Sequence, residues 1–221
     1  MRRQCSVSSC RQQATGFSTH CDAHKQTLRR HGHAEQKGVT VHELRPYQER
    51  IRERRAKNPG NPTWALLERR WEALTAHAEA TMARYAAGTP AITHERQTAE
   101  QLLTLRDSTS KDAVIDTVLA LFAMNAHRPT RFQSDKAFRF QVARRVRGLA
   151  IANAGLSRDA KSGRLKRTYR DTPPRAMECL AASLESAFGV AGLRLAELDM
   201  REATTGEAER RQLAAALKDL Q

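Results

Sequence analysis

The sequence predicts a mainly α-helical protein, in which a small N-terminal zinc module precedes a multi-helix domain with one short hairpin. Three of the four cysteines stand in the first 21 residues, and apolar residues recur at spacings of three and four later in the chain. The turn-forming segment 58–62, Asn-Pro-Gly-Asn-Pro, separates these parts. We therefore expect three units: a zinc-binding module (1–37), a basic connector helix with its linker (38–60), and a helical domain (61–221) with a basic segment (131–175).

The N-terminal cysteines and histidines form two pairs with metal-ligand spacing. Four residues separate Cys5 from Cys10, and two separate Cys21 from His24. Two tight turns with this spacing can present soft ligands tetrahedrally to zinc. Cys21 also opens a helical segment, 22–31, so the second pair would lie on the first turn of a helix. We expect one structural Zn²⁺ that joins this helix to the preceding loop.

The N-terminal cysteines and histidines allow two other interpretations. His20 is a competing ligand because it is adjacent to Cys21, whereas Cys179 stands alone and is expected to be a small core residue. The N-terminal cysteines could instead be reduced core residues, but this segment has few other groups to fold around. Its sizeable apolar side chains are Val7, Phe17 and Leu28. Structural zinc supplies roughly 10–16 kcal/mol to such modules, which favours a metal site.

The charge of the chain implies a polyanionic partner. Lys and Arg number 38 against 24 Asp and Glu, which gives a net charge of +14. Residues 1–60 carry +8 and residues 131–175 carry +10, whereas 61–130 carry −1 and 176–221 carry −3. Two basic blocks on a near-neutral scaffold are typical of two contact surfaces for phosphates.

The periodicity of the chain predicts where its helices lie. Residues Val39–Leu44 are expected to be extended, and a helix from Pro46 to about Lys57 follows, charged on nearly every side as a solvated connector would be. From Thr63 to Gly88 an apolar stripe marks a long helix. Another helix of the same chain can cover this stripe, or Trp64 and Trp71 can form a partner or self-association interface over helix 64–85. Further helices are expected at about 90–106, 112–125 (the centre of the core), 134–151, 173–188 and 207–220, with a short hairpin in 153–171 that includes LKRTY.

Helix 134–151 has two distinct faces. One is apolar, and the opposite face places Lys136, Phe140, Arg144 and Arg147 in a second stripe, where cations flanking an exposed aromatic suit phosphate contacts and stacking. The alternative is that Phe140 packs under a neighbouring element. Together with the preceding helix and the basic hairpin, it resembles a winged helix-turn-helix in outline. The residues expected to contact DNA are Lys25, Arg29, Arg30, Lys136, Arg139, Phe140, Arg144, Arg147, Arg164, Lys166, Arg167 and Arg170.

The N-terminal segment CSVSSCRQQATGFSTHCDAHKQTLRRHGH resembles the short zinc-binding module of phage and mobile-element proteins, some of which continue into HNH endonucleases. The resemblance covers residues 4–37 and rests on the four ligands and on the run Arg29-Arg30-His31-Gly32. It departs at Lys25 to Leu28, where the family usually has aromatic residues. It implies a bacterial mobile-element setting.

Catalytic patterns are weak in this sequence. The histidines outside the module stand singly, and one asparagine, Asn125, lies close to one of them, His127. The chain has neither a Gly-rich phosphate loop nor a nucleophile elbow. We therefore expect no enzyme, although a zinc-containing nuclease or recombination enzyme remains the rival interpretation.

These patterns predict a non-enzymatic, zinc-containing DNA-binding protein, an accessory or regulatory factor of a bacterial mobile element or phage. A protein–protein adaptor in a nucleoprotein complex is a further alternative, and RNA remains open as the ligand. A recombinase or transposase is a candidate protein partner. No signal-peptide h-region follows Met1 and no run suits a bilayer, so a cytoplasmic, nucleoid-associated protein without membrane contact is expected.

Overall fold

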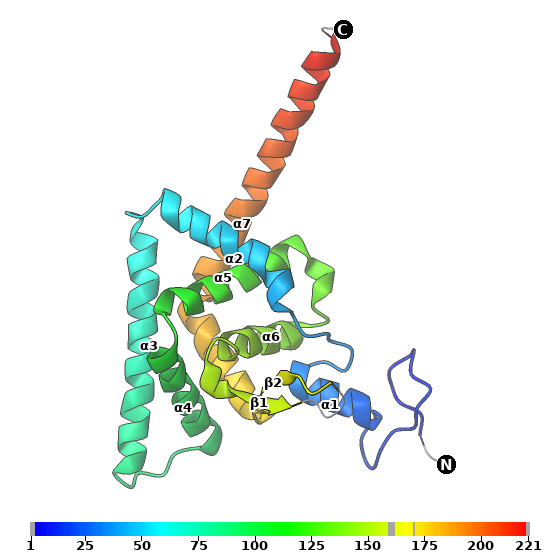
Figure 1. The fold of residues 1–221 in the computed structure, drawn as a ribbon, viewed down its shortest axis with the longest axis vertical. Helices are drawn as coiled ribbons and strands as arrows, with labels where there is room; N and C mark the ends of the chain where they lie inside the picture. The colour runs from blue at the N-terminus through cyan, green and yellow to red at the C-terminus, as the bar shows by residue number, and fades with distance from the viewer. Residues whose placement is uncertain (1–2, 159–161, 170, 220–221) are drawn as a thin grey trace.

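The computed structural model describes residues 3–158, 162–169 and 171–219; within 154–157, 165–169 and 207–219 it describes the backbone alone. The described chain is mainly helical, as the sequence predicts, with a single antiparallel hairpin (Figure 1). Its elements are α1 (Asp22–His31), α2 (Val41–Lys57), α3 (Pro62–Ala86), α4 (Thr93–Ser108), α5 (Lys111–His127), the 3-10 turn η1 (Pro129–Arg131), α6 (Asp135–Arg147), the 3-10 turn η2 (Ile151–Asn153), β1 (Ala154–Arg158), β2 (Leu165–Tyr169) and α7 (Pro174–Asp219).

Helix α5 forms the centre of the core. Every residue from Val114 to Met124 is buried, because this segment is apolar on nearly all sides and must be covered all round. Helices α2, α3, α6 and α7 pack around it, and α4 packs on α3 and α7. The predicted central helix is therefore confirmed.

The apolar stripe of α3 is covered by the same chain. Trp64, Leu67 and Trp71 are buried in the main core, where α3 contacts α4, α5 and α7. The indole N–H of Trp64 also donates to the backbone carbonyl of Asn58 at 3.0 Å. The interpretation that another helix of the same chain covers the stripe is thus confirmed at Trp64 and Trp71, and the alternative of a partner interface at these two residues is wrong.

Helix α2 begins earlier than predicted. Residues Val39–Leu44 are not an extended piece, because Thr40 and Glu43 form a capping box that starts the helix at Val41, ahead of Pro46. The helix is also not solvated on every side: Leu44 and Ile51 are buried in the core that α2 shares with α5. The turn at 58–62 therefore connects two helices of one core.

Helix α7 is continuous where two separate helices, 173–188 and 207–220, were expected. Gly189 and Gly192 do not end it. A Cβ at Gly192 would lie 2.6 Å from the ring of Phe122, so this glycine lets α7 approach α5 closely. The C-terminal part of α7 extends away from the other helices (Figure 1). By length and composition alone, Pro174–Gly206 could cross a membrane, although part of this stretch is buried in the core.

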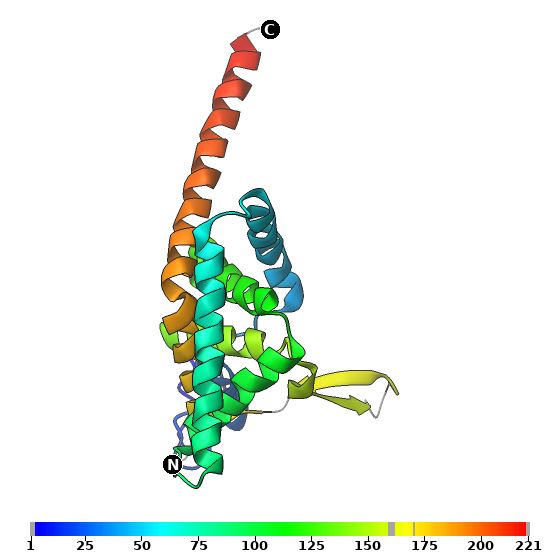
Figure 2. The same cartoon turned by 90° about the vertical axis from the view of Figure 1, so that its left-hand side faces the viewer.

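The hairpin is present where the sequence predicts one. Strands β1 and β2 pair antiparallel, with Leu156 opposite Arg167, and LKRTY forms β2. The hairpin projects sideways from the helices (Figure 2). The helix before it, α6, ends at Arg147 rather than at residue 151.

Candidate metal centre and basic recess

The four predicted ligands converge at one point. The Nδ1 atom of His24 lies 3.4 Å from the Sγ of Cys5 and 3.3 Å from the Sγ of Cys21, and the sulfur atoms of Cys10 and Cys21 lie 3.8 Å apart. All four ligand atoms lie within 4.8 Å of one another. A tetrahedral ion with metal–sulfur bonds of about 2.3 Å separates its sulfur ligands by about 3.8 Å. The group therefore has the dimensions of a site that can bind a metal ion.

Local backbone structure presents these ligands. The N–H of Cys10 donates to the carbonyl of Val7 at 2.9 Å, which closes a tight turn, and the N–H of Cys5 donates to the carbonyl of Gln12 at 3.0 Å. Cys21 is the N-cap of α1, but its side chain makes no capping hydrogen bond and joins the ligand group instead.

The module has its own small core and a defined ligand set. Cys5, Val7, Cys21 and Ala34 form a buried cluster separate from the main core, with Cys10 packed against it. The alternative ligand His20 lies outside the group, with its Nδ1 3.0 Å from the hydroxyl of Thr19. Within the described residues, one group of three or more Cys, His, Asp or Glu side chains has metal-site geometry.

The electrostatics of the thiols also suit a cation. Burial raises the pKa of Cys5, but hydrogen bonds with the backbone of Cys21 and Val7 and with the side chains of His24 and Cys21 lower it to about 6. At Cys10, a hydrogen bond with the backbone of Gln12 lowers the pKa, yet burial and the two neighbouring thiols together raise it. The thiolate of Cys5 therefore forms readily, whereas the thiolate of Cys10 needs a neighbouring positive charge.

Helix α1 docks on α6 through its C-terminal end. Gly32 adopts a φ of 79°, and a Cβ there would lie 2.9 Å from both the ring of Phe140 and the carbonyl oxygen of Lys136. Phe140 is consequently 1% exposed. The alternative that Phe140 packs under a neighbouring element is confirmed, because α1 covers it. The interpretation of Phe140 as an exposed aromatic that stacks on a base is wrong.

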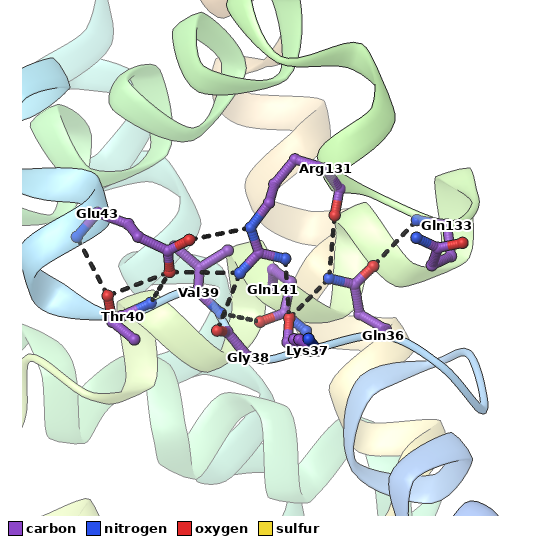
Figure 3. A network of polar contacts seen from close by, with 9 residues as sticks. All are labelled: Gln36, Lys37, Gly38, Val39, Thr40, Glu43, Arg131, Gln133 and Gln141. Atoms are coloured by element: carbon purple, nitrogen blue, oxygen red, sulfur yellow. Dashed lines mark hydrogen bonds and ion pairs between the residues drawn. The ribbon is translucent and has the colours of Figure 1, made fainter.

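The segment after α1 is held to the helical domain by a polar network (Figure 3). The guanidinium of Arg131 donates to the carboxylate of Glu43 and to the carbonyls of Lys37 and Gly38, at 3.0–3.3 Å. Gln141 accepts from the N–H of Val39 at 2.9 Å and contacts Nδ1 of His31 at 3.1 Å. The side chain of Gln36 donates to the carbonyl of Arg131 at 3.4 Å and accepts from the N–H of Gln133 at 3.0 Å. The metal-binding module is therefore fixed against α6.

Two of the predicted DNA-contacting residues on α6 lie beside acidic partners. Lys136 forms an ion pair with Glu178, and Arg139 forms one with Glu185 at 2.8 Å. Both carboxylates belong to α7, so they partly neutralise these exposed cations.

The remaining basic residues lie on α1, on the hairpin and at the end of α6. Lys25, Arg29 and Arg30 are exposed on α1, and Arg164 is exposed in the hairpin loop. Arg147, by contrast, is 6% exposed and Arg144 is half-buried. Lys166 and Arg167 lie on β2, where only the backbone is described, and Arg170 lies outside the described residues.

The two basic blocks meet where α1 crosses α6. Arg29, Arg30, Arg144 and Arg147 line one shallow recess together with Asp171, and we call this the basic recess. Nη1 of Arg144 donates to the carbonyl of Arg30 at 3.4 Å, although 114 residues separate them. Arg30 also forms an ion pair with Asp171 at 3.2 Å.

The pKa of His31 reflects the positive charge of this region. Its pKa is lowered to about 4, first by burial and then by the positive charges of Arg144, Arg30 and Arg131. Sequence reasoning predicted two separate basic blocks but missed their meeting point, for which local patterns carry no signal. It also passed over Arg145, although three arginines fall in this one turn of α6.

Comparisons with protein-family models, with curated proteins and with solved structures find no match for the chain. Its function must therefore be argued from its own residues.

Proposed function

We propose that this chain is a non-enzymatic, zinc-containing protein that binds duplex DNA through the surface around the basic recess. The observation that carries the proposal is the convergence of Arg29, Arg30, Arg144 and Arg147. A group of cations on one surface attracts the phosphates of a polyanion. Lys25 on α1 and Arg164 on the hairpin are further exposed cations.

Contacts with the phosphate backbone fit this surface better than the reading of base edges. Helix α6 is buried on most sides, including at Phe140 and Arg147, so it does not suit the role of a recognition helix in the major groove. The exposed cations on α1 and the projecting hairpin instead suit phosphates. We therefore propose binding that depends strongly on salt and weakly on sequence.

We propose zinc as the metal held by Cys5, Cys10, Cys21 and His24. Three thiols and one imidazole are the soft donor set that zinc prefers, and four protein ligands leave no open position for a substrate. The ion would hold α1 to its preceding loop and thereby keep Lys25, Arg29 and Arg30 in place.

The biological setting that we propose is an accessory or regulatory role in a phage or other bacterial mobile element, as the resemblance of residues 4–37 implies. A factor of this kind would act in the cytoplasm, beside a recombinase or transposase. This setting rests on the resemblance alone.

The test is a titration of a labelled duplex with the full chain, in chloride salts at several concentrations, with Mg²⁺ present and the DNA examined afterwards. We expect binding at low salt, a steep fall of log K with log[salt], and intact strands. No binding at 50 mM salt would overturn the proposal. Metal-dependent cleavage would replace it with the nuclease alternative.

A further inference from the structure

Helix α7 lies along the side of the molecule opposite the hairpin and turns one face outward (Figure 2). Residues at spacings of three and four share one face of a helix. Phe188 and Leu195 are buried in the main core, on the inner side of α7. The opposite side carries one residue per turn, and we call it the outer face of α7: Arg175, Cys179, Ala182, Ser186, Val190, Leu193 and Glu197.

The outer face exposes large apolar side chains on a fixed part of the helix. Val190 is 59% exposed and Leu193 is 56% exposed, although Phe188 and Leu195 beside them are buried in the core. The backbone at these two residues is therefore held by the core while their side chains stand in water. Apolar groups that gather on one exposed side of a helix are typical of a contact with another molecule.

The first half of the outer face borders a groove between α3 and α7. The groove has a volume of about 610 Å³, and its lining includes Leu74 of α3 and Ala182 and Ser186 of α7. A water molecule needs about 10–15 Å³, so the groove has room for whole side chains. The guanidinium of Arg70 donates to the carbonyl of Ala187 at 3.0 Å, which joins the two walls.

The outer face is complementary in shape to a second copy of itself. If two copies of α7 run antiparallel about a two-fold axis beside Ser186, each residue faces the one that lies equally far from Ser186 in the other copy. Val190, four residues after Ser186, then faces Ala182, four residues before it. Leu193 likewise faces Cys179, each seven residues from Ser186. Each large apolar side chain thus meets a small one that lines the groove.

The charges of the outer face match in the same arrangement. Glu197 lies eleven residues after Ser186 and Arg175 lies eleven residues before it, and both are exposed. They face each other between two antiparallel copies, whereas within one chain about 33 Å of helix separates them. Asp199, by contrast, lies on the inner side of α7 and pairs with Arg50 of α2 at 3.2 Å.

From these observations, we infer that a second copy of this chain docks on the outer face of α7 and forms an antiparallel two-fold dimer. Val190 and Leu193 of each copy enter the groove of the other, and Arg175 of each copy pairs with Glu197 of the other. This inference goes beyond the proposed function and does not depend on it, because the outer face includes none of the residues that line the basic recess.

Sedimentation velocity of the metal-loaded full chain, without DNA, tests the inference at about 1–100 µM protein. We expect a species of twice the 24.8 kDa chain mass. Val190→Glu should raise the Kd of the dimer at least about a hundredfold, because the two-fold axis places the new charge in the interface twice. Val41→Glu is the matched control: Val41 is 52% exposed at the start of α2, outside the outer face, and its replacement should leave the Kd unchanged.

An exchange of charges tests the antiparallel arrangement itself. Arg175→Glu should raise the Kd of the dimer about tenfold, because it places two carboxylates opposite each other at both ends of the interface. Adding Glu197→Arg to the same chain should restore the wild-type Kd, since the reversed pair meets again between copies. Such a rescue cannot arise within one chain, where the two residues are too far apart, or from a loss of folding. A double variant as weak as Arg175→Glu alone contradicts the inference.

The remaining outcomes separate this inference from other occupants and from the proposed function. A wild-type chain that stays monomeric at about 100 µM overturns the inference. A monomer that binds phosphatidylglycerol vesicles, and loses this binding in Val190→Glu, also overturns it and assigns the outer face to a lipid surface. If the chain dimerises but does not bind a duplex, the dimer stands and the proposed function fails. If a monomer binds the duplex, the proposed function stands and the dimer fails.

Discussion

Replacing Gly32 by alanine should separate the metal-binding module from the helical domain. Two effects add at this position. The φ of 79° costs an L-residue about 1–2 kcal/mol. A Cβ only 2.9 Å from the carbonyl oxygen of Lys136 and from the ring of Phe140 adds an overpacking cost of about 1–3 kcal/mol. We therefore expect Gly32→Ala to destabilise the contact between α1 and α6 by about 2–5 kcal/mol.

Gly88→Ala is the matched control for this change. Gly88 follows α3 with a φ of 88°, but nothing lies within 4 Å of a Cβ there. It should cost the backbone part alone, about 1–2 kcal/mol. Urea denaturation followed by circular dichroism measures global unfolding, and hydrogen exchange of residues 36–40 measures undocking of the module. If Gly32→Ala costs no more than Gly88→Ala by both measurements, α1 does not pack on α6 as described.

Metal analysis of protein purified without added zinc should give one zinc per chain. The Cys21→Ser variant should lose the zinc while its helical domain stays folded, because the described main core begins at Val39. Folded wild-type protein without metal would contradict this prediction. The ion pair between Glu43 and Arg131 should make stability depend on pH. The hydrogen bond and charge of Arg131, together with hydrogen bonds from the backbone and side chain of Thr40, lower the pKa of Glu43 from 4.5 to about 2, against an opposing effect of burial. A lowered carboxylate pKa stabilises the fold above about pH 4.5, and this stability is lost as pH falls towards about 2. This contribution to the free energy of unfolding is about 1–2 kcal/mol after screening by solvent. Urea denaturation should therefore show that, from pH 6 to pH 2.5, the free energy of unfolding of Arg131→Gln declines by that much less than in the wild type. An identical decline would refute the assignment.

Short-range patterns account for what the sequence predicted correctly. The ligand spacing of the first 24 residues identified all four members of the metal group, since two tight turns suffice to bring them together. The all-round apolar character of residues 114–124 identified the central helix for a similar reason. Both signals depend on neighbours in the chain, which a sequence displays directly.

The errors on α6 and α7 come from contacts between distant segments. The pattern of α6 shows an apolar face and a mixed one, but only the fold shows that α1 covers Phe140 on the mixed face. The sequence predicted two helices at 173–188 and 207–220, but α7 is continuous, and within it Gly192 provides space for Phe122 of α5. A glycine has the same appearance in a sequence whether it ends a helix or admits a neighbour.

The late start predicted for α2 has a different cause. The capping signal was present in the sequence as Thr40 and Glu43, three residues apart. Pro46 outweighed it in the sequence interpretation, because proline at a first helical turn is also a start signal. In the structure, Pro46 is accommodated within the helix after the capping box has begun it.

The central claim, that the face around the basic recess contacts DNA phosphates, is tested most directly by the salt dependence of a matched pair of variants. The test variant combines Lys25→Gln with Arg29→Gln and removes two exposed cations from α1. The control variant combines Arg69→Gln with Arg84→Gln and removes two exposed cations from α3, which lies on the far side of the molecule (Figure 1). Each phosphate contact contributes about 0.9 to the slope of log K against log[salt]. We predict that the α1 pair flattens this slope by about 1.8 and weakens binding about ten- to thirtyfold at 0.15 M salt, whereas the α3 pair leaves the slope nearly unchanged. Equal slopes for the two folded variants would contradict the claim.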